Sequence, residues 1–132
     1  MSLSEPVSAA ARSGSVSAAP RAQPVSLRNN RNVQRVLIDP PDAEATIFFI
    51  HDALTHLHQW DAQLKHFRRK RSFRVIAYDA LGCGGSSKPE AKDAYSEDEL
   101  LEDFLELWRQ HFMEGKVNVI VGHGYGDVMA VR

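Results

Sequence analysis

The sequence has little of what several protein classes require. It contains 1 cysteine in 132 residues, so no disulfide can form within the chain and a thiolate-rich zinc site is excluded. No apolar run approaches the roughly 20 residues that a bilayer-spanning helix needs, so we expect no transmembrane segment. The formal net charge of -1 gives no basis for binding nucleic acid or a charged membrane surface. What remains, at 43% hydrophobic and 25% charged residues, has the composition of about one globular domain.

Large apolar residues are nearly absent from residues 1–32, which are rich in Ser, Ala, Pro and Arg. Such a segment buries too little apolar surface to offset the entropy lost on ordering, so we predict a disordered tail. Its four arginines face a single acid, Glu5, a bias that is also typical of mitochondrial transit peptides. Because an amphipathic stripe and a secretory apolar region are both missing, we expect an intracellular and cytoplasmic protein, with a mitochondrial one as the alternative.

Residues 33–132 alternate between extended and helical patterns, which predicts an α/β fold with a mostly parallel sheet and helices on both faces. Continuous apolar runs are typical of strands that are covered on both faces. The expected strands are residues 34–38 (QRVLI, the weakest), 46–50 (TIFFI), 74–78 (RVIAY) and 117–121 (VNVIV).

Two helices are expected between these strands. The first is indicated by an apolar stripe of Trp60, Leu64 and Phe67, which the basic residues 68–71 follow. The second begins at a capping box of Ser96 and Glu99 and is expected to end at Gly115. Helix-dipole effects and a solvent-facing acidic surface explain the basic run and the acids of the second helix without a partner.

In parallel sheets the chemistry lies at the carboxyl ends of the strands. Here the three apolar runs are followed by His51-Asp52-Ala53, by Asp79-Ala80-Leu81-Gly82-Cys83-Gly84-Gly85-Ser86, and by Gly122-His123-Gly124-Tyr125-Gly126. From about Val36 onward, this order resembles the α/β-hydrolase superfamily, and especially its abhydrolase-domain branch. The family shows a strand, His-Gly and a Trp; then D-x-x-G-x-G-x-S; then the nucleophile elbow G-x-S-x-G. The matching positions are His51 and Trp60, then Asp79, Gly82, Gly84 and Ser86, then Gly122 and Gly126.

The resemblance implies the N-terminal half of an α/β-hydrolase fold, a partial domain over residues 33–132 that ends just after the elbow. The family places a Ser, Cys or Asp nucleophile at the elbow's centre, where this chain has Gly124. Glycine carries no nucleophilic atom. The neighbouring His123 and Tyr125, whose phenol has an ordinary pKa near 10, do not replace it.

The loop that the resemblance identifies as the oxyanion loop is also altered, since Asp52 stands where the family has glycine. A carboxylate pointing inward there would repel a developing oxyanion. The backbone N–H groups of Ala53 and Tyr125 are the remaining candidate donors. The family's acid and base lie downstream of the elbow, beyond Arg132, so we expect none of the three catalytic groups within these residues.

These departures indicate a catalytically inactive fragment or pseudoenzyme of an ester or lipid hydrolase lineage. A noncatalytic binding module and an active, serine-independent hydrolase with a remodelled site stay open as alternatives. We expect no cofactor and no metal: His51, His56 and His58 are interpreted as structural or surface residues, and Cys83 as an inert thiol. A small ester or lipid is the expected ligand class, and self-association through an exposed edge at residues 117–121 is the expected contact between copies.

Overall fold

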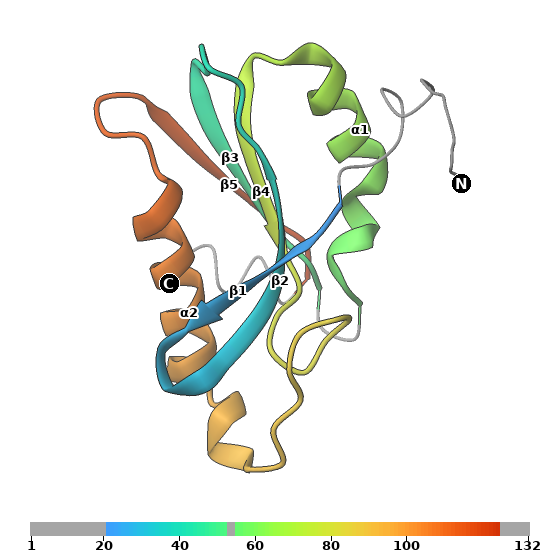
Figure 1. Cartoon of the computed structure of the whole chain (residues 1–132), viewed down its shortest axis with the longest axis vertical. Coiled ribbons are helices and arrows are strands. Elements are labelled where there is room, and N and C mark those ends of the chain that lie inside the picture. Colours follow the sequence, from blue (N-terminus) through green and yellow to red (C-terminus); the bar gives the residue numbers. More distant parts are fainter. Residues whose placement is uncertain (1–20, 53–54, 125–132) are drawn as a thin grey trace.

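A five-stranded sheet forms the centre of the molecule in the computed structural model, which describes residues 21–52 and 55–124 (Figure 1). Its spatial order is β1-β2-β4-β3-β5. The strands are β1 Gln23–Leu27, β2 Arg31–Ile38, β3 Ala45–Ile50, β4 Phe73–Tyr78 and β5 Val117–Gly122.

The sheet is mixed. Strand β3 lies between β4 and β5 and pairs parallel with both, as the three apolar runs predict. Strand β2, the weakest of the expected strands, is antiparallel to β4, and β1 is antiparallel to β2. The predicted α/β class is therefore confirmed, with an antiparallel hairpin added at one edge of the parallel strands.

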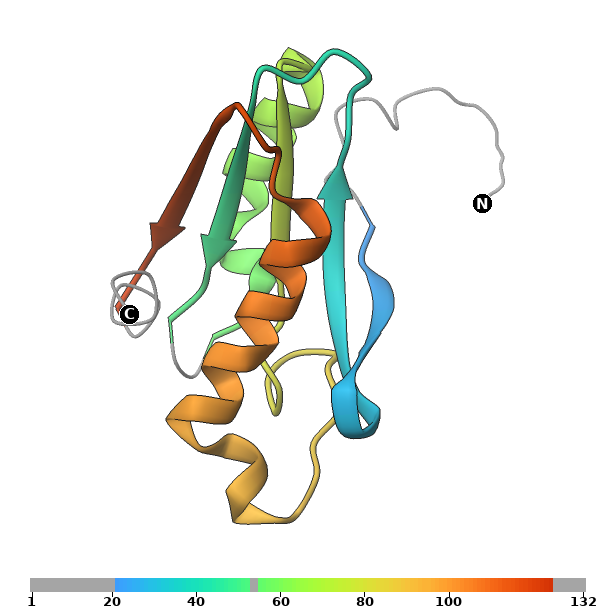
Figure 2. The same cartoon turned by 90° about the vertical axis from the view of Figure 1, so that its left-hand side faces the viewer.

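The two helices, α1 Asp61–Lys70 and α2 Glu97–His111, cover opposite faces of this sheet (Figures 1 and 2). Consecutive residues of β3 show why its apolar run is continuous. Phe48 packs edge-on against Phe104 of α2, with ring centroids 5.8 Å apart. Phe49 points to the other face, where its ring lies 4.8 Å from that of Trp60, at the start of α1. Each face thus holds its own apolar cluster.

Helix α2 begins as predicted but ends earlier. The Ser96 hydroxyl accepts a hydrogen bond from the Glu99 backbone N–H at 3.2 Å. The last helical residue is His111, and Gly115 instead occupies a following turn with φ +78°. The Asn118 side chain holds that turn through two hydrogen bonds to the backbone of Met113. The side chain of Asn118, not the glycine alone, shapes this turn, which is why the glycine signal misplaces the helix end.

The prediction of a disordered tail is wrong for residues 23–32, which form β1 and the start of β2; residues 1–20 lie outside the described residues. The turn between the strands is the 3-10 helix Arg28–Asn30. Asn29 and Asn30 adopt positive φ values of 56° and 59°, which asparagine tolerates better than most residues. Leu27 packs into the apolar cluster beneath α2.

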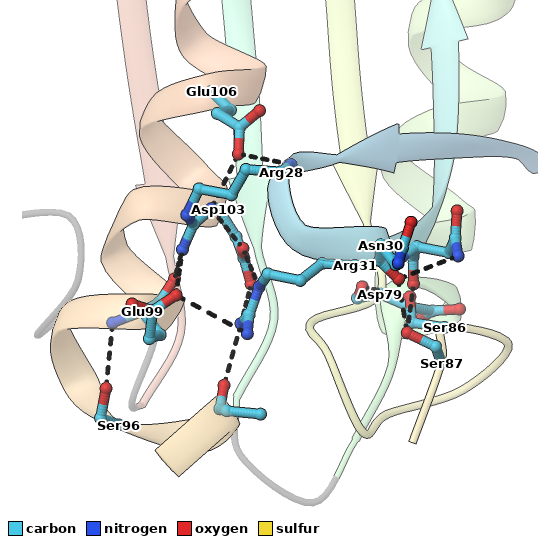
Figure 3. A network of polar contacts seen from close by, with 12 residues as sticks. Arg28, Asn30, Arg31, Asp79, Ser86, Ser87, Ser96, Glu99, Asp103 and Glu106 are labelled. Carbon is cyan, nitrogen blue, oxygen red and sulfur yellow. Dashed lines mark hydrogen bonds and ion pairs between the residues drawn. The ribbon is translucent and has the colours of Figure 1, made fainter. Parts of the chain in front are cut away.

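Ion pairs between the hairpin and α2 are the second reason why this segment is ordered (Figure 3). The Arg31 guanidinium donates two hydrogen bonds of 2.7 Å to the carboxylate of Asp103. Arg28 donates to the side chains of Glu99, Asp103 and Glu106 over 2.7–2.9 Å. Because Asp103 is 1% exposed, the acids of α2 do not form the purely solvent-facing surface expected from the sequence.

Among the described residues, none of the helices has the length and apolar character needed to cross a membrane.

Candidate functional site

Three loops meet at the carboxyl edge of the parallel strands, where the sequence places the candidate site. They follow β3, β4 and β5, respectively, and begin at His51, Asp79 and His123. Short 3-10 helices lie in the first two loops, at Leu57–Trp60 and Lys92–Tyr95. The parallel pairing of β3 with both neighbours brings the three strand ends together.

The buried Asp79 carboxylate organises the loop after β4. Its Oδ1 accepts the Leu57 N–H at 2.7 Å, and its Oδ2 accepts the Gly85 N–H at 2.9 Å. The carboxylate therefore ties this loop to the loop after β3. Gly84 has φ +49°, and a Cβ there would overlap the Asp79 carboxylate, so this position requires glycine.

The other fixed positions of the D-x-x-G-x-G-x-S pattern also have structural roles. The Ser86 hydroxyl donates to the Asp79 carbonyl at 2.6 Å and accepts the Gln34 N–H of β2 at 2.9 Å. Gly82 has φ +84°, and a Cβ there would approach Tyr95 Cε1 to 2.7 Å. The motif thus joins β2, β4 and the turn at residues 57–60 into one hydrogen-bonded unit.

His51 is buried directly after β3, and both of its ring nitrogens form hydrogen bonds with the backbone. Its Nε2 accepts the Ala80 N–H at 2.9 Å, so in a neutral ring the proton resides on Nδ1. Nδ1 then donates to the Asp52 carbonyl at 2.6 Å. Both ring nitrogens are occupied, and the imidazole is not free to act as a general base.

Gln59 connects the loop after β3 to the loop after β5, a role that the sequence reasoning missed. Its Oε1 accepts the Asp52 N–H at 2.9 Å, and its Nε2 donates to His123 Nδ1 at 3.0 Å. The His123 N–H donates to the Ile50 carbonyl at 3.2 Å. No periodic or motif signal singles out Gln59; only its position directly before Trp60 hints at a place in this turn.

The centre of the elbow pattern lies against the altered oxyanion loop. Gly124 has φ +61°, and a Cβ at this position would overlap the Asp52 carboxylate. The Asp52 side chain therefore occupies the space in which a side chain at position 124 would begin. Gly122, the first glycine of the pattern, is the last residue of β5.

Three predicted site residues, Ala53, Tyr125 and Gly126, lie outside the described residues. Of the remaining candidates, Cys83 is half-buried, and burial, followed by the nearby Asp79, raises the pKa of its thiol. This shift favours the protonated, less reactive form. His58 Nδ1 lies 3.0 Å from Asp61 Oδ1 in an exposed pair. Within residues 21–52 and 55–124, no three His, Cys, Asp or Glu side chains gather as metal ligands would.

Comparison with known proteins supports the pattern read from the motifs. Residues 45–127 match the family model of the alpha/beta hydrolase fold. Human Protein ABHD8 is 37% identical over 84 residues, which are 64% of this chain and 18% of that protein. Epoxide hydrolase 1 of Caenorhabditis elegans is 33% identical over 92 residues, covering 67% of this chain and 21% of that enzyme. The chain thus spans about a fifth of the length of these relatives.

Solved structures agree with the sequence matches. A structure described among novel epoxide hydrolases of the alpha/beta hydrolases superfamily, from metagenomes of hot environments, superposes with a TM-score of 0.70 at 32% identity. The superposition covers 84% of this chain and 36% of that one. The family model, the relatives and the shared architecture lead to one conclusion: this chain belongs to the α/β-hydrolase fold family.

Proposed function

We propose that this chain is a noncatalytic member of the ester and lipid hydrolase lineage, acting through binding rather than turnover. The observation that carries the proposal is the pairing of Gly124 with Asp52. The elbow's centre has no nucleophilic atom, and a carboxylate lies in the space from which the nucleophile would project. No acyl- or alkyl-enzyme can form on glycine.

The electrostatics of the same loop support the proposal. Acyl transfer builds negative charge on the substrate oxygen, which hydrolases stabilise with backbone N–H donors. Here a carboxylate stands beside the elbow, and like charges repel most strongly where water is excluded. The Asp52 N–H is already bound by Gln59, and His51 has both ring nitrogens engaged.

The relatives support the lineage but not a particular reaction. Epoxide hydrolase 1 and the metagenomic epoxide hydrolase are named for epoxide substrates, and both match only through a part of their length. A small ester, epoxide or lipid is therefore the ligand class that we propose for the elbow region, bound without covalent chemistry.

A second candidate function rests on the same carboxylate. Asp52 stands where a nucleophile's side chain would begin, which makes it the candidate nucleophile or base of a serine-independent hydrolase. This alternative makes a distinct prediction, because all activity would then depend on one carboxylate.

Hydrolysis assays separate these functions. The purified chain is incubated with a short-chain aryl ester and with an aromatic epoxide, beside its Asp52→Asn variant and an active serine esterase. We expect both forms of the chain to match the buffer rate. Turnover by the unmodified chain would contradict the proposal, and its loss in Asp52→Asn would assign the chemistry to Asp52.

A further inference from the structure

A cavity away from the elbow is built from three separate segments of the described chain. It has a volume of about 530 Å³, which lies within the range of small-molecule sites. Its walls come from the β1–β2 turn, the end of the loop after β4, and the segment that leads into α2 (Figure 3). We call it the hairpin cavity. Its charged lining residues are Arg31, Lys88, Asp93 and Glu99.

Arg31 supplies a preorganised donor to this cavity. Its side chain is 7% exposed, and Asp103 and the Ala94 carbonyl engage its Nε and Nη2 atoms. Its Nη1 forms a long ion pair of 3.8 Å with Glu99 and makes no hydrogen bond within the described residues. Arg31 lines the cavity, and its Nη1 is not among the fully enclosed atoms that lack a partner. The Nη1 N–H groups, which make no hydrogen bond within the described residues, can donate to a ligand carboxylate.

The remaining ionic groups of the cavity set its preferred ligand charge. Lys88 donates to the carbonyls of Gly84 and Ser86, which leaves one ammonium N–H for a ligand. The Asp93 carboxylate makes no hydrogen bond or ion pair within the described part of the chain, and Glu99 already binds Arg28. The cavity is therefore lined by charged groups of both signs: Arg31 and Lys88 as cations, and Asp93 and Glu99 as acids.

We propose that the hairpin cavity binds a small zwitterion of the amino-acid or dipeptide class. Arg31 and Lys88 donate to its carboxylate, and its ammonium group donates to the Asp93 carboxylate. A zwitterion satisfies ionic groups of both signs and adds no net charge, whereas a simple anion or cation would face one repelling pair. The cavity does not include the elbow, so this site is independent of the proposed function.

Thermal-shift and calorimetric titrations test the site with glycylglycine as the probe. Acetate, ethylamine and glucose serve as single-feature controls for carboxylate, ammonium and neutral hydroxyl binding. Because a ligand that binds only the folded state raises its melting temperature, we expect a concentration-dependent rise with glycylglycine alone. No shift with glycylglycine at millimolar concentrations, or a larger shift with glucose or acetate, would overturn the proposal.

Two substitutions locate the binding. We expect Lys88→Met and Asp93→Asn each to weaken glycylglycine binding by about tenfold, the cost of one charged hydrogen bond. The matched controls Lys92→Met and Glu90→Gln change neighbouring exposed charges that do not line the cavity, and they should leave the affinity unchanged. Arg31 is not varied, because it also holds the hairpin on α2. Binding that persists in both cavity variants would place the ligand elsewhere and refute the site.

Discussion

The loops after β4 and β5 both match glycine patterns of the same fold family, yet the two differ in what stands at their centre. In the loop after β4, Asp79 is buried and every fixed position has a hydrogen-bonding or steric role. In the loop after β5, the flanking Gly122 matches, but the position that carries chemistry is Gly124, against a carboxylate. A match to the family pattern can therefore indicate the shared fold in one loop, while the next loop lacks the residue that the family's reaction requires.

The largest loss of stability is expected from a substitution that disrupts the loop after β4. Asp79→Ala removes the acceptor for two backbone N–H groups and leaves both without a partner, so we expect a loss of about 3 kcal/mol in unfolding free energy. Urea denaturation measures it. Glu90→Ala, an exposed acid nearby, is the control and should change stability by less than about 0.5 kcal/mol. Equal, small effects of both changes would show that the Asp79 loop is not structural.

A smaller loss of stability is expected from adding a side chain at the centre of the elbow. Gly124→Ala combines a positive φ with an overlap on Asp52, so we expect a loss of about 2 kcal/mol. The matched control is Gly115→Ala, where φ is +78° but the space around a Cβ is open, and the expected loss is about 1 kcal/mol.

The double-variant cycle isolates the contact. In an Asp52→Gly background, Gly124→Ala should lose only the backbone cost, leaving a coupling of about 1 kcal/mol. Additive losses would mean that Asp52 does not lie against Gly124.

Acid should weaken the opposite, amino edge of the sheet. There His111 is buried and accepts a hydrogen bond from Arg35 at 3.0 Å; burial, then Arg35 and Arg74, lowers the pKa of His111 to about 4. Because the unfolded chain takes up this proton at a higher pH, near 6.5, stability is full above that pH and falls as the pH drops toward 4. From these two pKa values we expect about 2 kcal/mol less stability at about pH 5 than at neutral pH. His111→Gln should remove this part of the slope; an unchanged slope would assign it to other groups.

The smallest change in stability is expected from a substitution at the exposed edge of the sheet, where the main measurement is self-association. Within the described residues β5 pairs on one side only, and Val117 and Val119 are 65% and 41% exposed. We predict that the 132-residue chain self-associates along this edge. Val119→Lys should shift the mass measured by light scattering toward the monomer while changing stability by less than about 0.5 kcal/mol. A monomeric unmodified chain with a cooperative transition would contradict the prediction.

How much of the fold could be predicted from the sequence depends on how far apart along the chain the contacting residues lie. The apolar runs of β3, β4 and β5 and the Ser96 cap are local signals, and each predicts its element. The hairpin at residues 23–32 was missed because its stabilising partners lie far along the chain: Arg31 and Asp103 are 72 residues apart. By composition alone that segment resembles a disordered tail, but the ion pairs with α2 hold it in an ordered hairpin.

The site was predicted in its parts but not in its arrangement. Gly124 and Asp52 each depart visibly from the family pattern, and the sequence identifies both positions. That the Asp52 side chain lies over Gly124 follows only from the pairing of β3 with β5, which brings their carboxyl ends together. Gln59, which links the two loops, belongs to no sequence motif, and only its position directly before Trp60 hints at its place in the turn.

With glycine at its centre, the elbow is expected to form no covalent intermediate. Intact-mass spectrometry tests it most directly, after the chain is incubated with a fluorophosphonate and, separately, with an aromatic epoxide. We expect an unchanged mass in both reactions, while an active serine esterase gains the phosphonyl group under the same conditions. A single adduct on the unmodified chain, mapped by peptide sequencing to Asp52 or to any residue of the elbow, would contradict it.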